Sequence, residues 1–181
     1  MKNKIILIIA YVLIIESIGF CIAIDKPEFI VKKYCQADYN GEGLSTDRFK
    51  KNIWPLLAWD EEYPGTGWDT CDVIKDFKII KVDVDDKNAI VKVKYHVLGK
   101  WGVKFIKNDH YDKVDFHLIM TDTGWKIKDD FYPRISIDAA LRQMEDILQE
   151  RESMEDQKDI FKKEIEQLKN SIIELKQVQI K

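Results

Sequence analysis

The chain has 181 residues, of which 45% are hydrophobic and 34% are charged, and its formal net charge is −3 at pH 7. These values exclude an intrinsic membrane bundle and a disordered chain, and the length fits one folded domain. The chain carries no basic run of the kind that indicates a nucleic-acid partner.

The first residues have the pattern of a secretory signal peptide. Two lysines precede an apolar stretch over 5–15, and the tripeptide at 21–23 has the small-x-small form that a signal peptidase accepts. We therefore predict that residues 1–23 are removed and that the protein is exported, either periplasmic or secreted. Two alternatives stay open: an uncleaved amino-terminal anchor, which Glu16 near its middle disfavours, and a lipid on Cys21.

Two cysteines remain after this cleavage, Cys35 and Cys71. An even number of cysteines in an oxidising compartment predicts one disulfide between them. Closing their loop would contribute roughly 3–4 kcal/mol by the loop-entropy relation. The alternative is a pair of buried free thiols.

Two helices are predicted at the start of the mature chain. Apolar residues recur at helical spacing over 27–39, with Pro27 suited to the first turn and Gly41 to a stop. Residues 44–47 offer a cap for a second helix, which Pro55 interrupts.

Residues 58–72 hold glycines, a proline, aromatic residues and acids, so a long loop is predicted there. Aromatic faces among carboxylates suit sugars, cationic ligands or a basic protein surface. The spacing of a dedicated calcium loop is missing, and we predict neither a metal site nor a cofactor. Alternatively, the tryptophans close one end of the domain and the acids are only solvated. The predicted binding residues are Trp59, Asp60, Glu61, Glu62, Tyr63, Trp68 and Asp69.

Period-two segments follow the loop. The segments 77–84 and 89–98 form a predicted hairpin, and 114–121 and 125–128 form a second one. Two helices followed by about four antiparallel strands predict an α+β domain over 24–133, in which the helices cover one side of a curved sheet.

Residues 134–181 contain no glycine or proline, and this segment is predicted to be a helical extension that Ser136 caps. Its second apolar stripe repeats at four-three spacing, as a coiled-coil seam does. The stripe supports two alternatives: an antiparallel hairpin packed on the chain's own sheet, or a homodimer. The seam residues are Phe161, Ile165, Leu168, Ile172 and Leu175.

Three strings carry a family resemblance: GEGLS at 41–45, TDTGWKIKDD at 121–130 and PRISIDAAL at 133–141. With the order of elements, they resemble uncharacterised exported bacterial members of the nuclear-transport-factor-two-like superfamily, a cone-shaped, cystatin-like α+β fold. The resemblance covers about residues 26–131.

The resemblance implies a sheet wrapped around a pocket beneath the helices. This scaffold hosts isomerases, dehydratases, ligand binders, immunity proteins and dimerisation modules, so the fold alone does not select a function. Isomerases of the fold place an acid with a tyrosine, or a His-Asp pair, inside the cone. Strand parity here puts Tyr95 inward as the one polar candidate. The predicted pocket residues are Tyr34, Tyr95, Phe116 and Trp125.

The histidines are weaker candidates. His117 lies two residues from Asp115 on one strand face, where it could bind a metal together with His96. Both side chains are predicted on the outward face, and the common hydrolase, zinc and nucleotide motifs are absent from the sequence. We predict no catalytic residue.

The sequence therefore predicts an exported, non-enzymatic binding or interaction protein of the bacterial cell envelope, such as an immunity or accessory protein, with a protein partner or a small ligand. One alternative is a small-molecule isomerase or hydrolase that uses the cone pocket. The other is a structural protein that self-associates through its carboxy-terminal helix.

Overall fold

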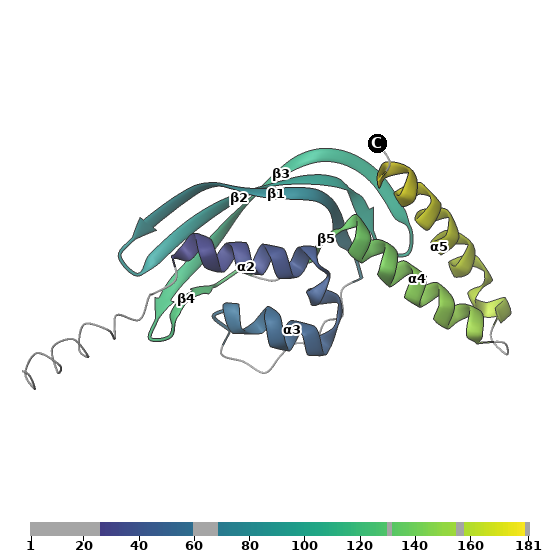
Figure 1. Cartoon of the computed structure of the whole chain (residues 1–181), viewed down its shortest axis with the longest axis horizontal. Coiled ribbons are helices and arrows are strands. Elements are labelled where there is room, and N and C mark those ends of the chain that lie inside the picture. Colours follow the sequence, from purple (N-terminus) through teal and green to yellow (C-terminus); the bar gives the residue numbers. More distant parts are fainter. Residues whose placement is uncertain (1–25, 60–68, 130–131, 155–157, 180–181) are drawn as a thin grey trace, which may run out of the picture.

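The computed structural model describes residues 26–59, 69–129, 132–154 and 158–179. A curved sheet arches over two helices, and a pair of helices packs against one end of the sheet (Figure 1). The α+β class predicted from the sequence is confirmed.

The amino-terminal helices are close to those predicted. Helix α2 spans Pro27–Tyr39, and Gly41 follows it with φ 79°, a left-handed conformation that glycine adopts without strain. The 3-10 turn η1 (Glu42–Leu44) leads into α3 (Thr46–Asn52). A further 3-10 turn, η2 (Trp54–Leu56), contains the proline predicted to interrupt the second helix.

The sheet has five strands in the order β4-β3-β2-β1-β5. All neighbouring pairs are antiparallel except β1 and β5, which are parallel. The strands are β1 (Cys71–Asp85), β2 (Asn88–Trp101), β3 (Phe105–Thr121), β4 (Gly124–Ile127) and β5 (Arg134–Ser136).

The strands are longer than the sequence predicted. Residues 107–111, which lie between the two predicted hairpins, belong to β3, and Lys107, His110 and Tyr111 pair with β2. Their polarity misled the sequence argument because this part of the strand is exposed. Gly99 permits the close pairing: a Cβ there would lie 2.4 Å from the carbonyl oxygen of Ile106.

The predicted inward face of β2 is confirmed. Four residues of this face are buried between the concave side of the sheet and α2 (Figure 1): Val91, Val93, Tyr95 and Val97. With residues from α2, α3, β3 and β4 they form a first core, which we call the cone core.

The carboxy-terminal extension is a helical hairpin. Ser136 caps α4 (Ile137–Ser153) by accepting a hydrogen bond from the amide of Ala139, and α5 (Lys158–Gln179) runs back along it. The antiparallel direction follows from two ion pairs: Glu145 of α4 meets Lys176 at an N–O distance of 2.9 Å, whereas Arg151, later in α4, meets Glu164, earlier in α5, at 3.4 Å. Of the two alternatives, the structure has the hairpin.

The apolar residues of this hairpin and the near ends of β1, β2 and β5 form a second core, the hairpin core. Three of the five predicted seam residues, Leu168, Ile172 and Leu175, are buried in it, while Phe161 and Ile165 are half-buried. Most of the seam is thus covered by the same chain.

The predicted disulfide is wrong. Cys35 and Cys71 are both free thiols and both buried. Cys35 lies in the cone core, where its sulfur is 3.0 Å from the hydroxyl of Tyr95, whereas Cys71 starts β1 and lies in the hairpin core. The even cysteine count misled the prediction because the fold assigns each thiol to a different core.

Candidate functional site

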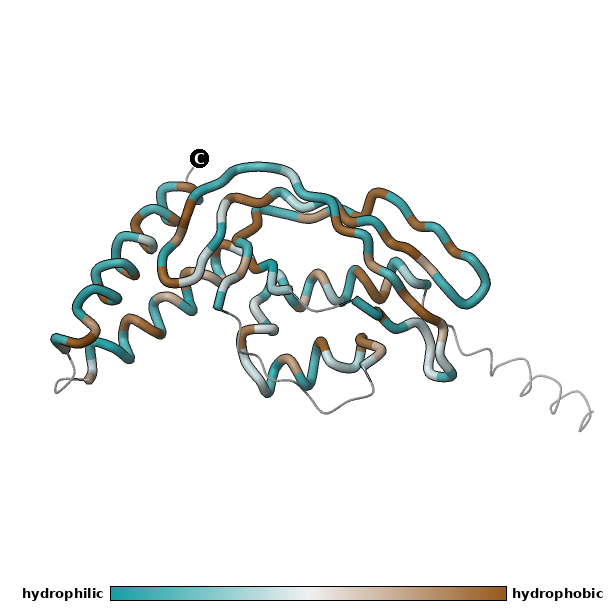
Figure 2. Tube along the Cα trace, turned by 180° about the vertical axis from the view of Figure 1, so that it is seen from behind, coloured by the Kyte–Doolittle hydropathy of each residue, from teal (hydrophilic) through white to brown (hydrophobic). Residues whose placement is uncertain are grey.

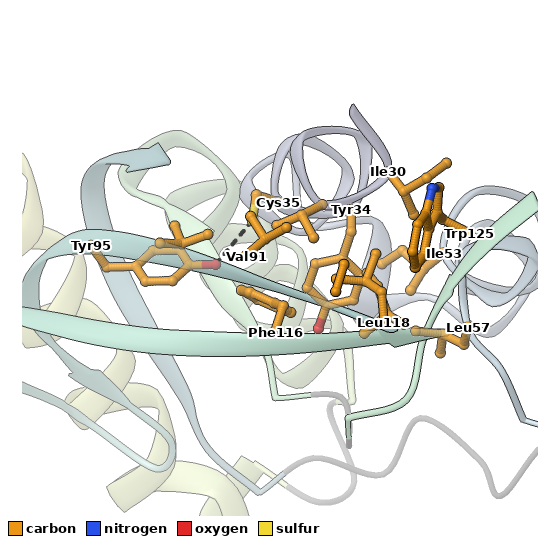
Figure 3. Packing of buried hydrophobic residues seen from close by; sticks show 14 of the residues in the cluster. Ile30, Tyr34, Cys35, Ile53, Leu57, Val91, Tyr95, Phe116, Leu118 and Trp125 are labelled. Carbon is orange, nitrogen blue, oxygen red and sulfur yellow. Dashed lines mark hydrogen bonds between the residues drawn. The ribbon is translucent and has the colours of Figure 1, made fainter. Parts of the chain in front are cut away.

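The four residues predicted to line a cone pocket do meet. Tyr34, Tyr95, Phe116 and Trp125 are all buried in the cone core, and the rings of Tyr34 and Phe116 pack edge to face with centroids 5.3 Å apart (Figure 3). Their side chains fill the space between α2 and the sheet. They lie together as parts of a packed interior.

A buried carboxylate, Asp38, borders this interior beside the half-buried Arg134. The carboxylate of Asp38 is 1% exposed, and its Oδ2 accepts a hydrogen bond from the amide of Arg134 at 2.7 Å. Within the described residues, Asp38 Oδ1 and Arg134 Nε have no hydrogen-bond partner. The guanidinium lies over the rings of Tyr95 and Tyr132, at 4.9 and 5.1 Å from their centroids.

Sequence reasoning missed Asp38, although a signal was present. Ile30, Tyr34 and Asp38 are spaced by four residues, which puts the carboxylate on the buried face of α2. The sequence prediction followed the helical spacing of this segment as far as Ala37 and did not include Asp38.

Burial disfavours the ionised forms of the titratable groups in and around this interior. Desolvation raises the pKa of Cys35 to about 12, and it raises the pKa values of Tyr34 and Tyr95 well above 10. Desolvation also raises the pKa of Asp38, against the opposing effect of Arg134. At neutral pH the interior therefore holds neither thiolate nor phenolate, and it offers no activated nucleophile.

An open groove lies elsewhere, between the sheet and the helical hairpin. Its volume is about 410 Å³, and its walls come from the end of α2, from β1, β2 and β3, and from the facing ends of α4 and α5. The lining includes both apolar and charged side chains. The lining residues are Tyr39, Ile74, Lys75, His96, Leu98, Lys107, Asp109, Ser136, Ile137, Asp138, Val178 and Gln179.

Polar groups of both signs are held in place around this groove. The Nε2 atom of His96 lies 2.8 Å from Oδ1 of Asp109. The imidazole ring of His96 also packs on the ring of Tyr111, and the two ring centroids are 4.7 Å apart. Across the groove, Asp138 accepts a hydrogen bond from Gln179 Nε2 at 2.7 Å. Ammonium, imidazole and carboxylate groups beside apolar walls can bind a ligand that carries both charges.

Two walls of this groove are hydrogen-bonded to each other. The hydroxyl of Tyr39, the last residue of α2, donates to the carbonyl oxygen of Lys75 in β1 at 3.2 Å. Sequence reasoning did not identify the groove because its lining comes from seven elements, β5 with Ser136 among them, and no local motif connects them.

The histidine pairings differ from those considered from the sequence. His117 pairs with Asp129, with Nδ1 and Oδ1 2.9 Å apart, whereas Asp115 pairs with Lys92. His96 and His117 are not neighbours, because His96 lies opposite Tyr111 in the register of β2 and β3. The metal pair considered for the two histidines is therefore not formed.

The predicted loop site falls mostly outside the described residues, which leave out Asp60, Glu61, Glu62, Tyr63 and Trp68.

The two described members of that loop lie apart from the groove. Trp59 packs against the cone core, with its ring centroid 5.6 Å from that of Trp54. Asp69 is exposed and lines a smaller cavity of about 210 Å³, together with Trp101 and Gln143.

In the part of the chain that the structure describes, no three metal-ligating side chains come together. No helix within the described ranges is long and apolar enough to span a bilayer.

Comparison with known proteins gives one structural likeness. No family model matches the sequence, and no curated protein matches it. A solved structure from Campylobacter jejuni, provisionally described as an NTF2-like transpeptidase, is similar to 59% of this chain over its own full length, with 14% identity and a TM-score of 0.32. A likeness at this level indicates no shared activity.

Proposed function

We propose that this chain is an exported, non-enzymatic binding module that holds a short zwitterionic peptide in the groove between its sheet and its helical hairpin. The groove carries the proposal because hydrogen-bonded charges of both signs lie in it beside apolar walls. Export is proposed from the signal-peptide pattern of residues 1–23.

The contrast between groove and cone supports binding over catalysis. An isomerase that used the cone would need space and an activated group among the inward residues. The inward tyrosines are buried against other side chains, and burial raises their pKa values, as it does that of Cys35. The groove residues His96 and Asp109 are accessible at its wall, and a packed interior is what a binding scaffold needs.

The test is thermal unfolding of the full chain with a library of di- and tripeptides. A peptide at one hundred times its Kd adds about 2.7 kcal/mol to the free energy of unfolding. Val178→Trp fills the groove from α5 and should abolish that gain, while Ile173→Trp on the exposed face of the same helix should keep it. Lys107→Ala should weaken binding, and Lys104→Ala, outside the groove, should not.

Equal binding by the Val178→Trp and Ile173→Trp variants would place the ligand elsewhere and overturn the groove assignment. Hydrolysis of a bound peptide that stops in His96→Ala would overturn the non-enzymatic part. Separately, cell fractionation that finds the chain in the cytoplasm with residues 1–23 still attached would overturn export.

A further inference from the structure

The outer edge of the sheet is open along most of β1. β5 pairs with β1 only from Asp72 to Ile74, and no strand of the described ranges pairs with that side over 75–85. An open edge offers unpaired backbone N–H and C=O groups to another strand. A bulge between Ile79 and Lys81 interrupts β1, and beyond it the pairing with β2 is regular.

The backbone beyond the bulge is arranged for pairing. Asp85 and Asn88 flank a two-residue turn and form a hydrogen-bonded pair of the hairpin. Hydrogen-bonded and non-hydrogen-bonded pairs alternate along an antiparallel ladder. The N–H and C=O groups of Val82 and Val84 therefore point to the open edge, and those of the residues between them point to β2.

Apolar side chains line the same stretch. Ile80, Val82 and Val84 are 41%, 36% and 56% exposed. Val82 lies opposite Val91 and Val84 opposite Ala89, so both share the face of the buried core while lying at its margin. Hydrophobic segments alternate with polar ones along this hairpin (Figure 2). On the face that carries Val82 and Val84, no charged side chain of β1 protects this edge against pairing with another strand.

We infer that this edge pairs antiparallel with the β1 edge of a second copy, about a two-fold axis at Val82. In that register Val82 meets its own counterpart across the axis, so apolar side chains face each other, with Ile80 and Val84 on either side. Lys81 then meets Asp83 on the other face, twice by symmetry. The two-fold relation makes one strand complementary to itself in both hydrophobicity and charge.

Neighbouring registers lack this match. An axis at Lys81 would oppose two lysines, and an axis at Asp83 would oppose two carboxylates. An axis between Val82 and Asp83 would set a valine against a carboxylate. The charges thus select a second copy of this strand in a single register, and they disfavour an unrelated strand.

The pairing goes beyond the proposed function and uses a different surface. Lys81 and Asp83 form an exposed ion pair within one copy, with an N–O distance of 2.8 Å, and both can exchange partners on association. The alternative dimer surface, the seam of α5, is largely covered because Leu168, Ile172 and Leu175 pack within their own chain.

The test is the solution mass of the full chain by sedimentation equilibrium over a concentration series. Wild type should reach twice the mass of one chain. Lys81→Asp puts a carboxylate at position 81 of each copy opposite Asp83 of the other copy. This like-charge contact occurs twice by symmetry and should weaken dimerisation about tenfold. The double variant Lys81→Asp, Asp83→Lys restores opposite charges and should return the wild-type constant.

Two controls separate the edge from other surfaces. Lys113→Asp makes the same charge change on β3 and should leave the mass unchanged. Val82→Pro removes an N–H that points to the open edge, not to β2, so it should abolish the dimer while far-UV circular dichroism stays unchanged.

A monomeric wild type would overturn the inference. So would a dimer that Lys81→Asp leaves intact, or one that Ile173→Glu on the outer face of α5 dissociates. Failure of peptide binding to the groove would leave this result untouched, because neither Lys81 nor Val82 lines the groove.

Discussion

The cone core and the hairpin core share the strands β1 and β2, yet they are sealed in different ways. The cone core is closed by α2 and α3, which precede the sheet, and it is rich in aromatic residues. The hairpin core is closed by α4 and α5, which follow the sheet (Figure 1), and it combines small residues such as Ala139 and Ala140 with aliphatic ones and with the rings of Trp101 and Phe105.

The difference shows how one sheet supports two separable bodies. The cone core packs its tyrosines between α2 and the sheet, and the buried carboxylate of Asp38 lies at its border. α5 contacts the sheet at few places: one is the hydroxyl of Ser171, which accepts from the amide of Phe105 at 2.9 Å. We therefore expect the helical hairpin to open at lower free energy than the cone.

The largest expected effect tests this directly. Phe116→Ala removes a ring packed against Tyr34 and should lower the free energy of global unfolding by about 3–5 kcal/mol. Leu175→Ala should cost about 2–4 kcal/mol, confined to the hairpin. Native-state hydrogen exchange distinguishes the two: if Leu175→Ala accelerates exchange in β2 as much as in α4, the two cores are one cooperative unit.

Ser171→Ala sharpens the attachment of α5. The hydroxyl of Ser171 accepts from the amide of Phe105 and donates to the carbonyl oxygen of Gln167. Removing the hydroxyl leaves the buried amide of Phe105 without this partner. This should cost about 1–3 kcal/mol, measured by urea unfolding. The matched variant Ser153→Ala, at the exposed end of α4, should cost less than the Ser171 change; equal costs would contradict the attachment.

Asp38 makes the cone core sensitive to pH. Burial raises the pKa of Asp38 in the folded chain above its unfolded value of 3.8. The resulting contribution to the free energy of unfolding is fully present below pH 3.8, and it is lost as the pH rises toward the folded pKa. The slope should approach, at most, about 1.4 kcal/mol per pH unit. Asp38→Asn should remove this slope in urea titrations across pH, and an unchanged slope would assign it to another group.

The exposed ion pairs between α4 and α5 should matter little. Lys176 and Glu145 are about half exposed, and solvent screens such a pair. Lys176→Ala should change the unfolding free energy by about 0.5 kcal/mol or less. A larger loss, in low salt and in high salt alike, would mean that the hairpin depends on this contact as well as on its apolar seam.

The smallest expected effect concerns the thiols, one in each core. A reductant should leave the melting temperature unchanged, because Cys35 and Cys71 are not bridged. Burial raises both pKa values to about 12, so a thiol reagent at pH 8 should react with neither cysteine until the chain unfolds. A drop in melting temperature on adding reductant would instead show that Cys35 and Cys71 are joined by a disulfide.

Several sequence predictions are confirmed for a local reason. Helix α2, its stop at Gly41 and the inward face of β2 follow from periodicity and from backbone preferences, which act between near neighbours. The strand β5 was missed because three residues that pair in parallel with β1 carry no period of their own.

The candidate site was beyond such arguments. The groove joins residues as distant as Tyr39 and Gln179, and its His96–Asp109 contact depends on the register of β2 and β3. The loop residues singled out from composition lie largely outside the described residues, and the one visible aromatic among them, Trp59, packs on the core.

The sequence by itself determined the α+β class, the alternation that buries one face of the sheet, and the helical nature of the tail, because hydrophobic period and propensity are local. Only the tertiary structure decided three further points. It put the two cysteines in separate cores, it folded the tail back on its own chain, and, among the described residues, it left most of one edge of β1 without a partner strand. Each depends on which distant segments meet, and burial energy over the whole chain selects those contacts.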